Sequence, residues 1–87
     1  MKIKIFVTDI DAGDIASRLK GYFILDEHKF KFNAVAFGRI GGHNVNIKLS
    51  KKDEKMLEEL GYDPEQVIIE AQRMMIEGDM EIIDKKG

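Results

Sequence analysis

The sequence predicts one α+β domain in which an antiparallel sheet is covered on one face by helices. Segments of alternating apolar and polar residues dominate the first fifty positions, the apolar spacing becomes helical after Ser50, and no linker or internal repeat divides the 87 residues. The expected order along the chain is βαβββαα, with antiparallel pairing among the three central strands. A single domain is therefore expected over residues 1–87, with a frayed tail at 85–87.

The first predicted element is a strand over residues 2–8, where Ile3, Ile5 and Val7 alternate with lysines. Such alternation is typical of a strand with one buried and one solvated face. The next stretch, "DAGDIASRL", predicts a short helix over residues 12–20 that ends before Gly21. It places two apolar residues four positions apart and two acidic residues in capping-box positions, namely Ile15 with Leu19 and Asp11 with Asp14.

Three further strands follow. The stretch "YFILDEHKFKFNAVAF" predicts strands over 22–25 and 29–37, joined by a turn at Asp26-Glu27-His28. The glycines of "GRIGGHN" predict the next turn, because glycine adopts positive backbone angles at low cost. A clean alternation then predicts a strand over residues 44–49.

Two helices are predicted in the C-terminal half. Ser50 and Asp53 form a capping box ahead of an apolar stripe that stops at Gly61. The second helix begins with Asp63 as its cap and Pro64 in the first turn, and it ends near residue 77. "DMEIID", after that helix, predicts a short edge strand.

The second helix carries more apolar residues than one buried face requires. The expected buried face comprises Val67, Ile68, Ala71, Met74 and Met75. Ile69 and Ile76 extend the apolar surface around the side of the helix. We therefore expect a homo-oligomer whose interface includes Ile69, Met75 and Ile76.

Composition excludes several classes of function. The chain has no cysteine, which excludes disulfides, thiolate zinc sites and cysteine nucleophiles. The first residues lack the features of a secretory signal and no apolar run is long enough to span a membrane, so we expect a cytoplasmic protein without membrane contact. Abundant Lys and Glu favour a thermophilic source.

Charge is divided unevenly along the chain. Residues 1–50 hold eight Lys or Arg against five Asp or Glu, whereas residues 51–87 hold six against eleven. The formal net charge of −2 therefore conceals a basic half and an acidic half.

"IFVTDIDAGD" resembles the first motif of the haloacid dehalogenase-like phosphatases, in which an apolar strand ends in Asp-x-Asp. The resemblance implies that Asp9 is a nucleophile and Asp11 a general acid/base beside magnesium. That family needs further βα units for its remaining site residues, and an 87-residue chain has no room for them. We interpret Asp11 as a helix cap and Asp9 as a solvated strand end, and we expect no enzyme activity.

No other pattern predicts a metal or cofactor. An EF-hand loop counted from Asp9 would need glycine at position six and glutamate at twelve, where Asp14 and Lys20 stand. His28 and His43 lie in predicted turns without the spacing of metal ligands. "GRIGGHN" precedes a strand, whereas phosphate-binding loops precede a helix.

The polar residues of the predicted sheet form the main functional candidate. If Gly41-Gly42 closes a hairpin, Phe37 lies opposite Asn44, Val35 opposite Asn46 and Asn33 opposite Lys48. One face then carries cations, amides and an aromatic ring without an acidic residue in these segments. Such side chains bind phosphates, base edges and base faces, so we expect RNA or DNA to bind at Lys31, Asn33, Phe37, Asn44, Asn46 and Lys48. Alternatively, they only keep a solvated sheet face soluble.

Residues 44–78, "NVNIKLSKKDEKMLEELGYDPEQVIIEAQRMMIEG", resemble the ribbon-helix-helix repressors and antitoxins, in which two helices follow a strand. The resemblance implies that Asn44, Asn46 and Lys48 read the DNA major groove from a ribbon formed by two chains. It also implies that the start of the second helix, near 63–66, approaches phosphate. A hairpin within the chain is the alternative pairing for this strand.

The sequence therefore leaves three functions open. A nucleic-acid-associated binding module is the leading hypothesis, and a protein-interaction or assembly domain without a nucleic-acid role is the alternative. A ribbon-helix-helix repressor or antitoxin is the third.

Overall fold

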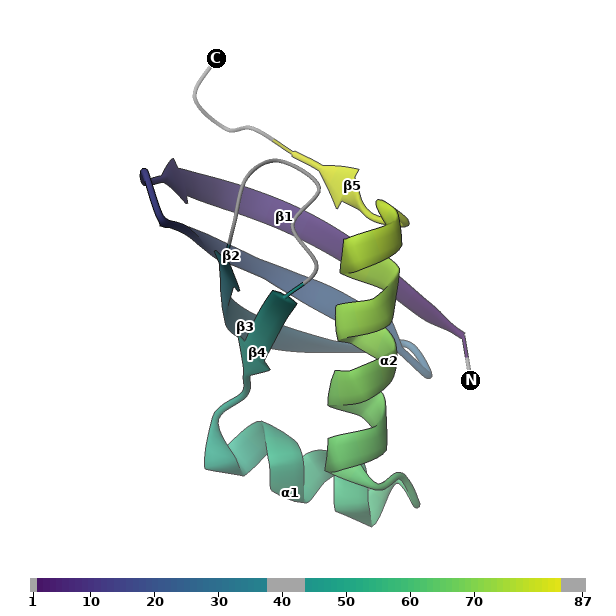
Figure 1. Cartoon of the computed structure of the whole chain (residues 1–87). Coiled ribbons are helices and arrows are strands. Elements are labelled where there is room, and N and C mark those ends of the chain that lie inside the picture. Colours follow the sequence, from purple (N-terminus) through teal and green to yellow (C-terminus); the bar gives the residue numbers. More distant parts are fainter. Residues whose placement is uncertain (1, 38–43, 84–87) are drawn as a thin grey trace.

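The computed structural model describes residues 2–37 and 44–83 and shows a five-stranded sheet with two helices against one face (Figure 1). The elements, in chain order, are β1 (Ile3–Ala12), β2 (Ala16–Leu25), β3 (His28–Phe37), β4 (Asn44–Lys48), α1 (Lys51–Glu59), α2 (Pro64–Glu77) and β5 (Glu81–Ile82). The strand order is β4-β3-β2-β1-β5. The turn expected around Gly41-Gly42, His43 and the tail at 85–87 lie outside the described residues.

The α+β class is confirmed, but the order βαβββαα is wrong, since four strands precede both helices. The sheet is also mixed: β1 to β4 pair antiparallel, while β5 runs parallel to β1 along two residues. The short edge strand expected in "DMEIID" is confirmed as β5.

The helix predicted over residues 12–20 is absent. β1 continues to Ala12 and β2 begins at Ala16, so this segment is a hairpin between two ten-residue strands. The physical reason is the burial pattern of β2, in which Leu19, Gly21, Phe23 and Leu25 alternate as buried positions. A helix would have relied on Ile15, which is 80% exposed in the hairpin connection.

One face of the sheet is buried beneath the helices. The strands contribute alternate apolar residues to this core. α1 and α2 each add apolar residues from one side of the helix, and these cover the core. The largest fully buried side chains are Phe23, Phe30, Leu25, Leu57, Val7 and Val67. Among the described residues, neither helix is long and apolar enough to cross a membrane.

Gly21 lies in β2 beside the irregularity of β1. It pairs with Val7 on one side and with Phe32 on the other, and the β1–β2 register shifts between Val7 and Asp9. A Cβ atom at Gly21 would collide with the carbonyl oxygen of Phe6 and lie 3.1 Å from the Phe32 ring. The absence of a side chain therefore permits both the β-bulge and the packing of Phe32 over the strand.

The helix boundaries agree with the predicted caps. The Ser50 hydroxyl accepts the backbone N–H of Asp53 at 3.1 Å, and the Asp63 carboxylate accepts that of Glu65 at 3.1 Å. Gly78 closes α2 in the left-handed conformation, with φ of 81°. These local signals fix where each helix begins and ends.

A side chain of α2 closes the outer edge of β4. Gln72 accepts the backbone N–H of Ile47 through its Oε1 atom at 3.0 Å. Because β4 is an edge strand, this N–H points away from β3 and would otherwise lack a partner in the sheet. The bond holds α2 against β4 and orients the sheet beneath it.

Gly21→Ala is expected to lower the free energy of unfolding by about 3 kcal/mol, because the added methyl group must push apart two backbones and a buried ring. Gly78→Ala is the matched control, since nothing lies within 4 Å of its Cβ position and only its backbone conformation is strained. That strain is worth about 1–2 kcal/mol. Urea unfolding followed by circular dichroism compares them, and equal losses would contradict the close contact at Gly21.

Candidate functional site

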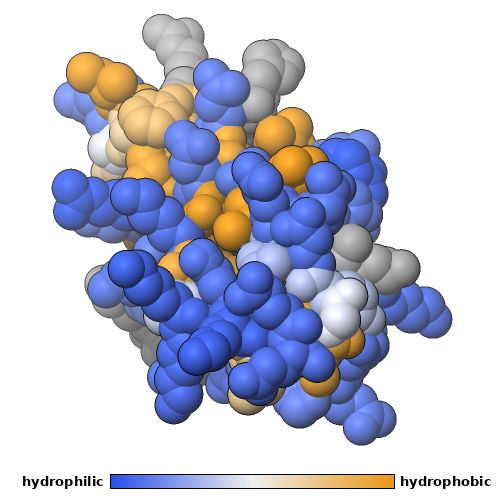
Figure 2. Space-filling view, turned by 90° about the horizontal axis from the view of Figure 1, so that it is seen from below, coloured by the Kyte–Doolittle hydropathy of each residue, from blue (hydrophilic) through white to orange (hydrophobic). Residues whose placement is uncertain are grey.

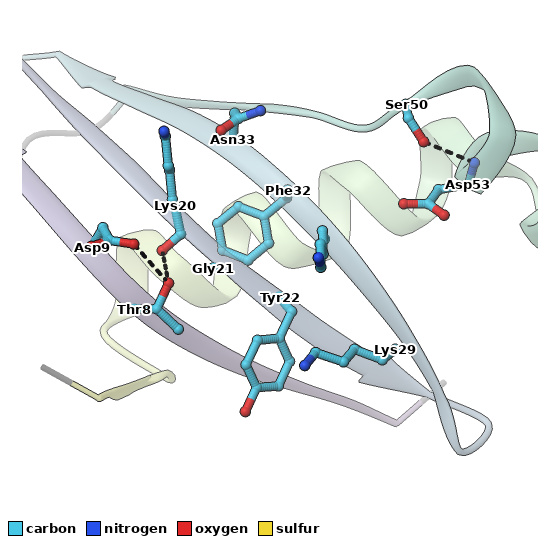
Figure 3. Close-up of a pocket in the computed structure, with 11 residues that line it drawn as sticks. Thr8, Asp9, Lys20, Gly21, Tyr22, Lys29, Phe32, Asn33, Ser50 and Asp53 are labelled. Carbon is cyan, nitrogen blue, oxygen red and sulfur yellow. Dashed lines mark hydrogen bonds between the residues drawn. The ribbon is translucent and has the colours of Figure 1, made fainter. Parts of the chain in front are cut away.

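The face of the sheet opposite the helices carries the residues that alternate with the core, and we call it the open face. Figure 3 shows part of it with a helix behind the sheet. The strand registers place these side chains in rows across β1 to β4. The open face comprises Lys4, Phe6, Asp9, Asp11, Arg18, Lys20, Tyr22, Ile24, Lys29, Lys31, Asn33, Val35, Phe37, Asn44, Asn46 and Lys48.

The register predicted for β3 and β4 is confirmed. Asn33 pairs with Lys48, Val35 with Asn46 and Phe37 with Asn44. The six candidate binding residues therefore share one face of two neighbouring strands, and all six are exposed: Lys31, Asn33, Phe37, Asn44, Asn46 and Lys48.

β2 adds functional candidates that the sequence analysis missed. Lys20 pairs with Asn33, which extends the row that ends at Lys48, and Arg18 pairs with Val35. Both cations had been assigned to a helix. The signal that could have found them is the alternation of apolar residues on either side of Gly21, which places Arg18 and Lys20 on the solvated face.

An aromatic pair lies at the centre of the open face. The rings of Phe6 and Tyr22 are stacked, with centroids 5.0 Å apart and an angle of 24° between their planes. The ammonium group of Lys29 lies 4.2 Å from the centroid of the Tyr22 ring. Both rings are half-buried, so their orientation is constrained by neighbouring side chains.

Asp9 and Asp11 lie within β1, not beyond its end. They pair across the hairpin with Lys20 and Arg18, and both are exposed. The helix that Asp11 was expected to cap does not form. At the bulge, the Thr8 hydroxyl lies 3.2 Å from the carbonyl oxygen of Lys20 and 3.3 Å from the Asp9 carboxylate (Figure 3), both within donating distance.

The described residues contain no group of three or more His, Cys, Asp or Glu side chains that could hold a metal ion. The ion pairs found in the described part of the chain join Arg73 to Glu70 and Glu77 on α2. The cations of the open face therefore make no direct ion pair with another described residue.

A shallow depression of about 490 Å³ opens on this face (Figure 3). It extends from the bulge in β1 across β2 and β3 to the start of α1. Three lysines lie along it, and one carboxylate lies toward each end. Its lining comprises Thr8, Asp9, Lys20, Gly21, Tyr22, Lys29, Lys31, Phe32, Asn33, Ser50 and Asp53.

The three residues expected at an oligomer interface do not share one environment. Ile69 and Ile76 are 51% and 39% exposed on α2, whereas Met75 is only 5% exposed and belongs to the core. Met75 packs within the chain because it lies on the buried face of α2 with Ala71. Of these three residues, only the two isoleucines are exposed enough to contact a partner.

The segment that resembles ribbon-helix-helix proteins pairs within the chain. β4 is hydrogen-bonded to β3, and its outer edge meets Gln72 at Ile47. At the start of α2, the carboxylate of Asp63 accepts the backbone N–H of Glu65. Side chains of the same chain thus occupy the outer edge of β4 and the first turn of α2, the two places where the resemblance implies contacts with a second chain and with phosphate.

Tyr62, in the loop between α1 and α2, makes a hydrogen bond that changes its titration. Its hydroxyl donates to the Asp26 carboxylate at 2.6 Å, which ties the loop between α1 and α2 to the turn between β2 and β3. This hydrogen bond, with burial and the charge of Asp26, raises the pKa of Tyr62 above its ordinary value of 10.0. Asp26 and Glu27 form that two-residue turn with φ of 52° and 65°.

Comparison with protein-family models, curated proteins and solved structures yields no match. The open face carries the features of this molecule that bear on function. Its cations, its aromatic pair and its depression are the observations that a function must explain.

Asp26→Gly is expected to return the pKa of Tyr62 toward 10.0, because glycine keeps the positive φ of the turn but removes the acceptor. A pKa raised by folding gives stability that is complete below the unfolded value and is lost as pH rises through the folded value. The parent should therefore lose this contribution above pH 10, and the variant should have none to lose. Tyrosinate absorbance in a Tyr22→Phe background measures both titrations, and identical curves would contradict the bond.

Proposed function

We propose that this protein binds nucleic acid through the open face of its sheet. The observation that carries the proposal is the concentration of cations there, which lie on four neighbouring strands without direct ion pairs to other described residues. They are Lys4, Arg18, Lys20, Lys29, Lys31 and Lys48. Cations so arranged bind phosphates and release the counterions that surround a polyanion.

The distribution of charge would orient a polyanion toward this face. α1 and α2 together carry seven Asp or Glu against four Lys or Arg, and α2, against which α1 packs, lies on the opposite side of the sheet. Hydrophilic residues cover most of the surface seen from the α1 side (Figure 2). On the open face, Asp9 and Asp11 lie opposite Lys20 and Arg18 in the register of β1 and β2. The other four cations of this face pair with uncharged residues, and they are Lys4, Lys29, Lys31 and Lys48.

The amide and aromatic residues support a nucleic-acid ligand over mere solubility. Lysines alone would keep a solvated sheet face from pairing with other chains. Asn33 and Asn46 add groups that donate to and accept from base edges, and Phe37 is 44% exposed where a base could stack. Solubility does not require an exposed aromatic ring, whereas base recognition uses one.

Lys31→Ala and Lys48→Ala are each expected to weaken binding and to reduce the slope of log K against log salt concentration by about one. Asn46→Ala should weaken binding without changing the slope, because it removes no charge. All three should leave the free energy of unfolding within about 0.5 kcal/mol of the parent, since the side chains are exposed. Fluorescence anisotropy with a mixed oligonucleotide pool at several salt concentrations measures the effects.

Lys52→Ala is the matched control, because Lys52 is an exposed lysine of α1. It changes the net charge equally but lies outside the open face. The proposal fails if no oligonucleotide binds at low salt, or if Lys52→Ala weakens binding as much as Lys31→Ala.

A second candidate function is self-association through α2. Ile69 and Ile76 favour it, since they lie two turns apart on one side of the helix and are 51% and 39% exposed. Apolar residues that gather on a surface mark contact sites in many proteins. In this alternative the lysines of the open face are only solvated.

Ile69→Lys with Ile76→Lys is expected to convert an oligomer to a monomer, because a contact would then bury charges without partners. Size-exclusion chromatography with light scattering, with and without oligonucleotide, measures the mass. Dissociation with intact nucleic-acid binding would count against assembly as the sole function. A monomeric parent at all concentrations would remove this candidate.

A further inference from the structure

We infer that the open face takes single-stranded nucleic acid, with one base stacked on the ring of Tyr22 at the place that Lys29 occupies in the free protein. This inference rests on the proposed function and specifies its ligand. It is carried by the stacked pair of Phe6 and Tyr22, the lysine above Tyr22 and the depression beside them.

The open face is wider than the major groove of an undistorted duplex. Neighbouring strands lie about 4.8 Å apart, so the axes of β1 and β4 are separated by roughly 14 Å before side chains are added. The major groove is about 12 Å wide and admits a helix or a two-stranded ribbon. A duplex also hides its base faces in its own stack, and an aromatic surface reaches them only when the strand is single.

Tyr22 is the ring best placed to receive a base. Phe6 supports one of its faces at a centroid distance of 5.0 Å, and it is half-buried in the second of four antiparallel strands. A ring held in this way loses little conformational entropy when a ligand stacks on it. Phe37, by contrast, lies at the end of β3 and is 44% exposed.

Lys29 does not block this site. Its ammonium group, 4.2 Å from the centroid of the ring, makes a cation–π contact. At an exposed position such a contact is worth about 0.5–1 kcal/mol, whereas stacking of a base on an aromatic side chain is worth about 1–3 kcal/mol. A base therefore displaces the lysine, whose flexible side chain then reaches the phosphate of the same nucleotide.

The depression beside Tyr22 has the dimensions and groups that a nucleotide needs. Its volume of about 490 Å³ lies within the range of about 300–1,000 Å³ typical of small-ligand sites. Lys20 and Lys31 line it as further phosphate partners, and Asn33, opposite Lys20 in the register, lines it as a partner for base edges. Asp9 and Asp53 accept hydrogen bonds, so they suit exocyclic amino groups and not phosphates.

Tyrosine fluorescence tests the stacking directly. The chain has two tyrosines and no tryptophan, so Tyr62→Phe leaves Tyr22 as its only strong emitter. Single-stranded DNA and single-stranded RNA, titrated separately, should quench this emission, while a duplex of the same sequence should bind more weakly and quench little. In proton NMR, the methylene signals of Lys29 nearest its ammonium, shifted upfield by the ring, should move toward random-coil positions when single strands bind.

Tyr22→Leu should weaken single-strand binding roughly 5- to 150-fold, which corresponds to the value of one stacked base. The salt slope should not change, because no cation is removed. Tyr22→Phe keeps the ring and should restore the affinity, which separates stacking from any loss of structure. Tyr62→Leu, the same change at a half-buried tyrosine outside the open face, is the matched control and should bind like the parent.

The outcomes separate this inference from the proposed function. Equal binding of single strands and duplex with unchanged Tyr22 emission would overturn the inference and leave the proposed function standing. Full single-strand affinity in Tyr22→Leu would also overturn the inference and leave the proposed function standing. Failure of every oligonucleotide to bind at low salt would overturn both.

Discussion

Burial on one side only is the constraint on which this structure depends. Residues 2–37 and 44–83 supply two helices, of which α2 lies across one face of the sheet and α1 packs against α2. The four long strands therefore bury alternate apolar residues on that face, and the side chains between them must tolerate water. The open face and its cations follow from this arrangement, because Lys and Asn are the residues that alternate with the core in β3 and β4.

The centre of β2 connects the packing of the core to the proposed site. Gly21 allows Phe32 to pack over the strand on the buried side, while its neighbours Lys20 and Tyr22 project from the open side. The bulge in β1 opposite Gly21 places the Thr8 hydroxyl beside the carbonyl oxygen of Lys20. A single residue without a side chain thus shapes both faces of the sheet at the point where the depression lies.

The separation of charge gives the molecule two electrostatic sides. Acidic residues in the helices are compatible with their first turns, where Asp53, Glu54 and Glu65 interact favourably with the helix dipoles. The glutamates of α2 would also repel a polyanion from the face that α2 covers. Cations on the open face attract it to the other side, so the charge layout favours one orientation of the ligand.

Local sequence patterns determined much of this protein, because caps and alternation act between residues close in the chain. Ser50, Asp63 and Gly78 mark helix ends, and the alternation in β3 and β4 gave the register of six candidate binding residues. Tertiary structure decided the rest. The segment over residues 12–20 forms a hairpin because a long strand buries Leu19 and Phe23 against distant partners. Phe6, Tyr22 and Lys29 come together only when three strands pair. Such contacts depend on strand registers that no single segment encodes.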